Sequence, residues 1–177
     1  MDVVKVFLFL FLAGLPALQA QEDDGIPWDE GRRLSWSDFR AIPPESQRVA
    51  ATTASGISYS YSTRGTPGNY RLDYQVVAYF YPQRSWYHPE ICDSVILSHE
   101  QLHFDISELF ARKMRDALGR RTFSKNVRAE VREIFSEINR ELSEFQDRYD
   151  KETDFSRNRE QQAAWNLRIA KMLERGG

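Results

Sequence analysis

Apolar and polar positions alternate along the first half of the chain, and this pattern predicts short strands. Residues 34–39 alternate and stop before the Pro-Pro pair at 43–44, which predicts a strand followed by a turn. Residues 49–61 are rich in Ala, Thr, Ser and Tyr with an apolar side chain at every second position near their end, so they predict a second extended segment. Residues 70–81 are dense in Tyr, Val and Phe and predict a strand that ends at Pro82.

One irregular segment lies between two of these strands and another precedes all of them. Residues 64–69 concentrate Gly, Pro and Asn, which supply the backbone angles of a turn, so we expect the strands on either side to form a hairpin. Residues 21–33 carry acids, Gly and Pro without periodicity, and we expect a loosely held N-terminal arm there.

Beyond Pro89 the apolar positions recur every three or four residues, which is the period of a helix. Asp93 or Ser94 is the predicted cap at the start of the first helix, because their side chains can accept hydrogen bonds from its first backbone N–H groups. Gly119 is its predicted end.

A second helix is predicted for residues 124–149 and a third for residues 161–173, separated by a polar break at 150–158. Strands followed by helices indicate an α+β fold. We therefore predict a small antiparallel sheet in the N-terminal half that packs on three C-terminal helices.

The start of the chain has the pattern of an export signal. Lys5 precedes an apolar run at residues 6–13, and small residues near Ala20 offer a cleavage site, so residues 1–20 are predicted to be a signal peptide. The run is too short for a membrane span, which needs about 20 apolar residues. We expect a secreted or periplasmic protein with no integral membrane segment after cleavage, and one domain over residues 34–177.

Charge and cysteine content narrow the possible partners. The chain has 24 basic and 26 acidic residues and a net charge of -2, so nothing favours nucleic acid, whose phosphates require a concentrated basic surface. Its single cysteine, Cys92, cannot form an internal disulfide, so packing or a metal must stabilise the exported protein.

The sequence His-Glu-Gln-Leu-His at positions 99–103 carries the candidate chemistry. On a helix this spacing stacks the imidazoles of His99 and His103 one turn apart, where both can bind one ion. Zn2+ is the expected metal, because neutral imidazole suits it and three protein ligands leave a fourth position for water. Glu100 is the predicted general base, since this motif brings its carboxylate toward that water.

Two histidines at this spacing also occur as ordinary core residues of an amphipathic helix. Here, however, the pair lies on the face that carries Val95, Leu102 and Ile106, where a buried imidazole needs a partner. We therefore favour metal binding over a core role.

Several residues compete for the third ligand position. Asp105 and Glu108 follow the pair closely but point away from its face, so they are poor candidates. If the first two helices form an antiparallel hairpin about Gly119, carboxylates of the second helix lie across from the pair, and the loop after it returns to the same place. Asp150 is the first choice, and Asp154, Glu137, Glu141 and His88 are further candidates.

Several separated segments resemble a bacterial family of predicted secreted zinc-dependent proteases, long catalogued as a domain of unknown function. They are residues 34–39 with Pro43 and Pro44, residues 50–53, 79–80, 85–86 and 99–106, Tyr149 and Asp150 with Thr153, and residues 161–166. The resemblance implies a zincin-like metallohydrolase domain, bound Zn2+ and a peptide or protein substrate.

One position departs from the family pattern. Many members have a His followed by Gly shortly after the Thr, and this chain has Phe155 and Ser156 there. If that His is the usual third ligand, then Asp150, Asp154 or a glutamate of the second helix completes the site here, or the metal is held weakly and activity is reduced or lost.

Two classes of function therefore compete. The first is a secreted zinc-dependent hydrolase, a peptidase with Glu100 as general base; a zinc amidase acting on cell-wall peptides would use the same site. The second is a non-catalytic exported binding or structural protein that keeps a structural or degenerate metal site, and Phe155 is the main argument for it.

Overall fold

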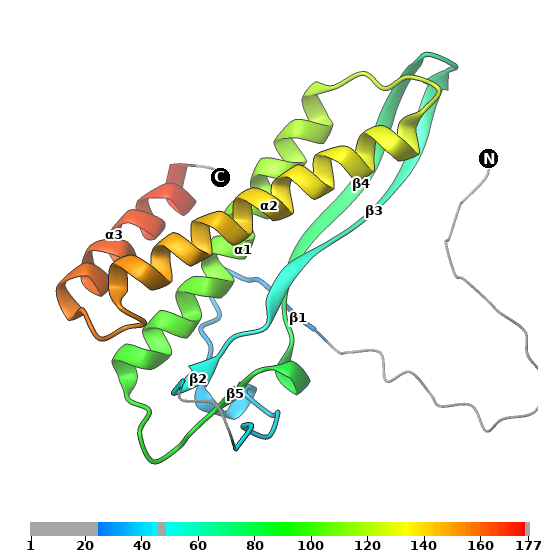
Figure 1. Cartoon of the computed structure of the whole chain (residues 1–177). Helices are drawn as coiled ribbons and strands as arrows, with labels where there is room; N and C mark the ends of the chain where they lie inside the picture. The colour runs from blue at the N-terminus through cyan, green and yellow to red at the C-terminus, as the bar shows by residue number, and fades with distance from the viewer. Residues whose placement is uncertain (1–24, 46–48, 176–177) are drawn as a thin grey trace, which may run out of the picture.

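The computed structural model describes residues 25–45 and 49–175. The predicted signal peptide, residues 1–20, lies outside this range. Figure 1 shows an α+β fold in which a long β-hairpin and shorter strands pack on three helices, as the pattern of apolar positions predicts.

The main sheet is built on the predicted hairpin. Strands β3 (Ser55–Thr66) and β4 (Asn69–Phe80) pair antiparallel along their whole length, and β1 (Ile26–Pro27) pairs with the other edge of β4. Gly65 and Gly68 at the turn have φ angles of 114° and 88°, which glycine adopts without steric cost. The turn chemistry at residues 64–69 thus has the predicted role.

The extended segment predicted at residues 49–61 forms two strands that belong to different sheets. Strand β2 (Ala51–Thr52) pairs with β5 (Trp86–Tyr87) in a separate two-stranded sheet, and only the second part of the segment enters the hairpin. The short 3-10 helix η2 (Pro82–Arg84) connects β4 to β5.

The strand predicted at residues 34–39 is wrong, because a 3-10 helix, η1 (Trp36–Asp38), occupies that place. The Asp38 carboxylate accepts hydrogen bonds from the backbone N–H and the hydroxyl of Ser35 at 2.8 and 3.1 Å. These local bonds favour a turn over an extended chain. An alternating pattern of only six residues could not reveal this competition.

The three predicted helices are α1 (Ser94–Arg120), α2 (Val127–Thr153) and α3 (Arg159–Arg175). Asp93 caps α1 as predicted, since its carboxylate accepts from the N–H groups of Val95 and Ile96, both at 2.9 Å. The polar break is shorter than predicted, because α2 continues to Thr153. Among the described residues, no helix is long and apolar enough to cross a membrane.

Gly119 does not end α1 as predicted, since the helix includes it and continues to Arg120. A Cβ atom at Gly119 would lie 2.8 Å from the hydroxyl oxygen of Tyr74 on β4. That hydroxyl donates to the backbone carbonyl of Arg115 at 2.8 Å. Glycine is therefore used for the close approach of sheet and helix.

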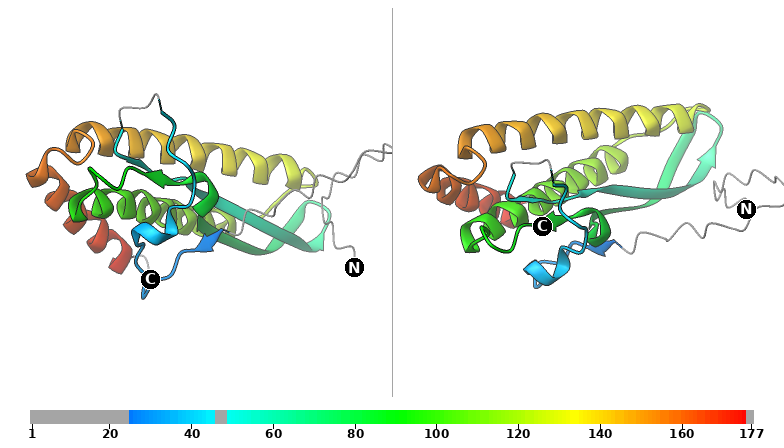
Figure 2. Two further views of the ribbon diagram at one scale, coloured as in Figure 1. Left: turned by 90° about the horizontal axis from the view of Figure 1, so that it is seen from below. Right: turned by 60° about the horizontal axis from the view of Figure 1, so that its bottom comes forward.

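Helix α1 occupies the centre of the molecule. It contacts β2, β3, β4, α2 and α3 (Figures 1 and 2), and Ile106, Ala111 and Met114 on it are completely buried. Helix α2 runs antiparallel to α1, and the hairpin tip bonds to the loop between them through the backbones of Tyr70 and Phe123 at 2.8 and 2.9 Å. Helix α3 lies at the other end of this assembly.

The described part of the N-terminal arm, residues 25–33, is held more firmly than predicted. Besides the pairing of β1 with β4, the indole N–H of Trp28 donates to the Asp105 carboxylate on α1 at 2.8 Å. The acids, Gly and Pro of the arm give no sign of this anchoring, because a single indole contact leaves no periodic pattern.

The Asp93→Ala variant is expected to lower the free energy of unfolding by about 1 kcal/mol, because it removes the cap of the central helix. Urea denaturation followed by circular dichroism measures this change. Asp116→Ala is the matched control on the same helix, since Asp116 pairs with exposed Arg120 on the surface and should change stability by less than about 0.5 kcal/mol. Equal effects of both substitutions would contradict the capping role.

Candidate metal centre

Three side chains bring one metal-ligating atom each to the same point. His99 and His103 lie one turn apart on α1, and Asp150 lies in the last turn of α2. Asp150 Oδ1 is 3.1 Å from His99 Nε2 and 3.0 Å from His103 Nε2, and the two Nε2 atoms are 3.3 Å apart. The structure thus brings the histidine pair together with Asp150, the first choice for the third ligand.

These separations are compatible with one bound ion. Tetrahedral zinc, with bonds of about 2.0–2.1 Å, holds its ligand atoms about 3.3 Å apart. Asp150 Oδ1 is buried, and among the described residues it accepts no hydrogen bond although two imidazole nitrogens lie close to it. A buried carboxylate oxygen in this position is costly unless a proton on one of the imidazoles or a cation satisfies it, so the residues present are compatible with a metal.

The electrostatic surroundings favour the ionised form of Asp150. Burial raises the pKa of the Asp150 carboxyl, but the neighbouring His103 and His99 imidazoles outweigh burial and hold that pKa well below its usual range. Burial lowers the pKa of His103, but the Asp150 carboxylate and the charge of Glu100 raise it overall above its ordinary value. Asp150 is therefore ionised at neutral pH and available to a cation.

A buried polar network surrounds the His99 ring. The Tyr149 ring stacks on it with centroids 4.5 Å apart, and its Nδ1 atom lies 2.9 Å from Gln162 Oε1. Neither Tyr149 nor Gln162 is among the candidates predicted from the sequence. A usable signal exists for Gln162, because this polar residue occupies the helical stripe of Trp165 and Ile169, which is buried.

Glu100 shares a cavity with the three converging side chains. The cavity has a volume of about 250 Å³, and Glu100, which follows His99 on α1, is 5 % exposed. The remaining lining residues come from the β2 segment, α1, α2 and the turn after α2: Val49, Ala50, Ala51, Thr52, Thr53, Ile96, Gln146, Phe155 and Ser156. The predicted base and the candidate ligands therefore face one space.

Residues 34–157 match a family described as a bacterial protein of unknown function, DUF922. The chain belongs to this family. No curated protein and no solved structure matches it. Both candidate histidines, Glu100 and Asp150 lie within the part that matches DUF922, whereas Gln162 on α3 lies beyond it.

The turn at the end of the DUF922 region has an unusual backbone. Asp154, Phe155 and Ser156 have φ angles of 48°, 52° and 71°, a left-handed conformation that costs non-glycine residues about 1 kcal/mol each. The Phe155 N–H donates to the Asp150 carbonyl at 2.9 Å, which ties the turn to the end of α2. Half-exposed Phe155 thereby lies at the cavity, where the family resemblance implies a histidine.

The glutamates of α2 that the sequence offers as third ligands lie elsewhere. Glu141 forms an ion pair with Lys113, about three turns further along α1 than His103, and Glu137 pairs with Arg140 at 2.6 Å on the exposed surface. The predicted hairpin of helices is present, but its register places the end of α2, rather than its middle, across from the histidines.

Asp154 and His88, the two remaining candidates for the third ligand, do not reach the cluster. Asp154 turns outward and pairs with Arg157 at 2.8 Å. His88 lies 3.6 Å from Glu90 and packs edge-on against Trp86. Each is therefore engaged with a neighbour in its own segment of the chain.

Asp105 and Glu108, rejected on helical spacing, serve in buried ion pairs. Arg33 contacts the Asp105 carboxylate at 2.9 Å, and Arg112 and Arg115 contact that of Glu108 at 3.0 and 2.9 Å. Both acidic residues are at most 4 % exposed. Their place on the opposite side of α1 agrees with the spacing argument.

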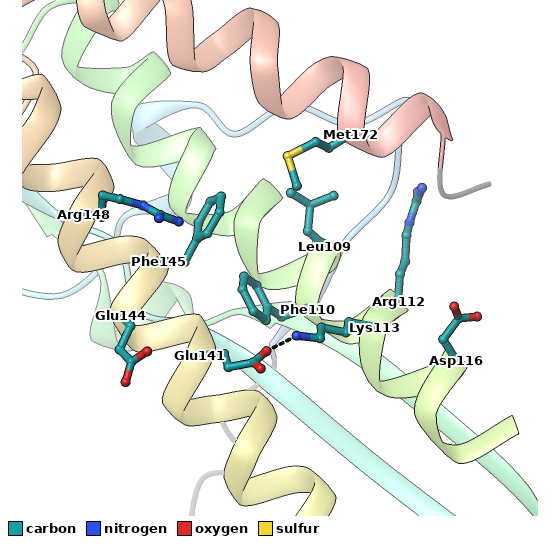
Figure 3. Close-up of a pocket in the computed structure, with 10 residues that line it drawn as sticks. All are labelled: Leu109, Phe110, Arg112, Lys113, Asp116, Glu141, Glu144, Phe145, Arg148 and Met172. Carbon is teal, nitrogen blue, oxygen red and sulfur yellow. Dashed lines mark hydrogen bonds and ion pairs between the residues drawn. The ribbon is translucent and has the colours of Figure 1, made fainter. Parts of the chain in front are cut away.

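A larger cavity of about 920 Å³ lies between α1, α2 and the C-terminal part of α3 (Figure 3). Leu109, Phe110, Phe145 and Met172 line it together with charges of both signs, and an ion pair joins Lys113 to Glu141 across two helices. It contains none of the converging ligand atoms. The candidate chemistry therefore belongs to the smaller cavity.

The Tyr149→Phe variant is expected to lower the free energy of unfolding by about 1–3 kcal/mol, because it leaves buried hydrogen-bonding groups of Gln162 and of the His99 backbone without their partner. Thermal or urea unfolding measures the change. Tyr61→Phe is the control, since Tyr61 lies on β3 and takes no part in this network. A Tyr149→Phe protein as stable as the control would show that the network does not contribute to folding.

Proposed function

We propose that this protein is an exported zinc-dependent hydrolase, specifically a peptidase. The observation that supports this most is the convergence of two imidazoles and one ionised carboxylate on one point, in a cavity that also contains Glu100. Membership of a bacterial family and the signal-like start of the chain are compatible with an exported enzyme.

Zinc is favoured over other metals by the donor set together with Glu100. Two histidines and one carboxylate also hold Fe(II) in oxygenases, where several coordination positions are left open for oxygen and substrate. A separate carboxylate directly after the first histidine is what proton transfer in hydrolysis requires, because a base must accept a proton from water. Metal analysis separates the two possibilities.

His99, His103 and Asp150 would hold the ion. When bound, zinc makes a water molecule acidic near neutral pH and polarises the substrate carbonyl. Glu100 accepts the proton of the attacking water on its carboxylate and then delivers it to the leaving amine, so the same oxygen atoms act first as base and then as acid. The low exposure of Glu100 keeps bulk water away from that proton.

The walls of the cavity favour a peptide as the substrate. One wall is the backbone of residues 49–53, which includes β2, and an extended peptide can align with such a segment through main-chain hydrogen bonds. Val49 and Phe155 place apolar, partly exposed side chains at the same cavity. We propose that they contact an apolar side chain near the bond that is cleaved.

The purified protein is expected to bind one zinc ion per chain. His99→Ala, His103→Ala and Asp150→Ala should each lose most of it, because two ligands hold zinc far less tightly than three. Elemental analysis after dialysis measures the content. His88→Ala and Asp154→Ala are matched controls that should keep wild-type zinc, and their loss of zinc would contradict the assigned ligands. Iron in place of zinc would reject the hydrolase.

Glu100→Gln is expected to keep the zinc and to lose peptide hydrolysis by a factor of about 10²–10⁴, because it removes only the proton acceptor. The assay is a panel of peptides that includes cell-wall peptides, on which a zinc amidase would act. The activity of Glu100→Gln is compared with that of the wild type at equal zinc content. Undiminished hydrolysis by Glu100→Gln would reject Glu100 as the base.

The competing proposal is an exported scaffold whose metal is structural. It predicts that zinc removal lowers stability while neither the wild type nor any variant cleaves a peptide. Phe155, in the position where the family resemblance implies His, favours this proposal, so Phe155→His belongs in the same assay. A gain of activity in that variant alone would identify the present site as a degenerate one.

A further inference from the structure

Gln162 on α3 contacts His99 from the side opposite the ligand cluster, and we infer that it is a positioning residue that sets the tautomer of this imidazole. Its Oε1 atom accepts the Nδ1 proton of His99, so that the Nε2 lone pair points toward His103 and Asp150. The expected effect of Gln162 on zinc affinity rests on the proposed function, whereas its effect on the tautomer of His99 does not.

The amide of Gln162 is oriented by its other contacts. Its Nε2 atom donates to the Tyr149 hydroxyl at 2.8 Å and to Asn166 Oδ1 at 2.9 Å, which uses both amide hydrogens. Asn166 Nδ2 in turn donates to Ser98 Oγ at 2.9 Å. Only the oxygen of Gln162 then faces His99, and an oxygen can only accept.

The network begins and ends on α1. Ser98 and His99 are neighbours on that helix, and the bonds run from one to the other through Asn166 and Gln162 of α3. The Tyr149 ring, stacked on the imidazole with planes 23° apart, limits rotation of the ring. Helices α2 and α3 therefore hold the imidazole of His99 in one orientation.

Burial makes these hydrogen bonds discriminate between the two tautomers of His99. Gln162 is 2 % exposed and Tyr149 is fully buried, so water does not replace a lost partner. The tautomer with its proton on Nε2 would leave Nδ1 without a proton to give to Gln162 and would place two acceptors face to face there. Asp150 Oδ1, 3.1 Å from Nε2, attracts the same proton, so Gln162 and Asp150 compete for it unless a cation occupies the cluster. In a neutral histidine the partner of one ring nitrogen decides whether the other is free to bind a metal.

A packing role is the other explanation of Gln162. It shares a buried stripe with Trp165 and Ile169, where any side chain of similar length would fill the same space. The two explanations differ in what they require of the side chain: packing needs its volume, whereas positioning needs an acceptor atom. Substitutions that keep one property and remove the other distinguish them.

The test compares Gln162→Met, which keeps the length but removes the acceptor, with Gln162→Glu, which keeps an acceptor. Gln161→Met on the exposed face of α3 is the matched control. The first readout is the tautomer of His99, read from imidazole ¹⁵N chemical shifts at a pH where the ring is neutral. It is taken in the Asp150→Ala background of each protein, so that no carboxylate competes for the Nε2 proton. The second is the zinc dissociation constant from competition with a chromophoric chelator.

We expect wild type, Gln162→Glu and Gln161→Met to carry the proton on Nδ1 and to bind zinc within a few-fold of one another. Gln162→Met should show a mixture of tautomers and bind zinc about 10–100-fold more weakly. If circular dichroism shows that Gln162→Met does not fold, Gln162→Asn, which withdraws the amide by one methylene, takes its place with the same expectation.

Two results would overturn the inference: a Met variant with the wild-type tautomer and affinity, or a Glu variant as impaired as the Met variant. Absence of zinc binding in the wild type would reject the proposed function instead. In that case the ¹⁵N measurement still decides whether Gln162 sets the tautomer, so the two failures are distinguishable.

Discussion

Burial of the polar residues of α1 is the constraint around which this structure is organised. The helix lies between the sheets and the other two helices, so its acids, amides and imidazoles are removed from water and need partners from elsewhere in the chain. Gln101 accepts from the backbone of Leu34, Asp105 from the N-terminal arm, and the Ser107 hydroxyl bonds with that of Ser55 on β3 at 2.8 Å. Each of these surrounding segments is thus docked by a polar contact as well as by apolar packing.

The candidate metal centre is the exception to this pattern. The buried acids Asp105 and Glu108 of α1 meet arginines or an N–H donor, whereas Asp150 Oδ1 on α2 meets two imidazole nitrogens. Arginine N–H groups donate hydrogen bonds to the carboxylates of Asp105 and Glu108, and no arginine takes this place at Asp150 Oδ1 among the described residues. This contrast distinguishes the candidate metal centre from the buried ion pairs of Asp105 and Glu108.

Sequence reasoning succeeds here where the interaction is local and fails where it depends on register. The spacing of His99 and His103 and the cap at Asp93 concern one helix, so periodicity is sufficient to find them. The choice between Asp150 and the glutamates of α2 depends on the register of α2 against α1. That register follows from the length of the loop after α1 and from its backbone pairing with the hairpin tip. Gln162 is harder still, because its role requires the position of a third helix.

The left-handed turn at Asp154, Phe155 and Ser156 connects α2 to α3. Each residue of a helix turns it by about 100°, so a residue added to or removed from this turn that shifted the start of α3 by one position would turn its side chains by that angle about the axis. Gln162 would then face away from His99, although no residue of the network had changed. The length of this surface connection therefore determines which side chains of α3 contact His99, and deletions there should disturb the candidate centre as much as substitutions in the interior.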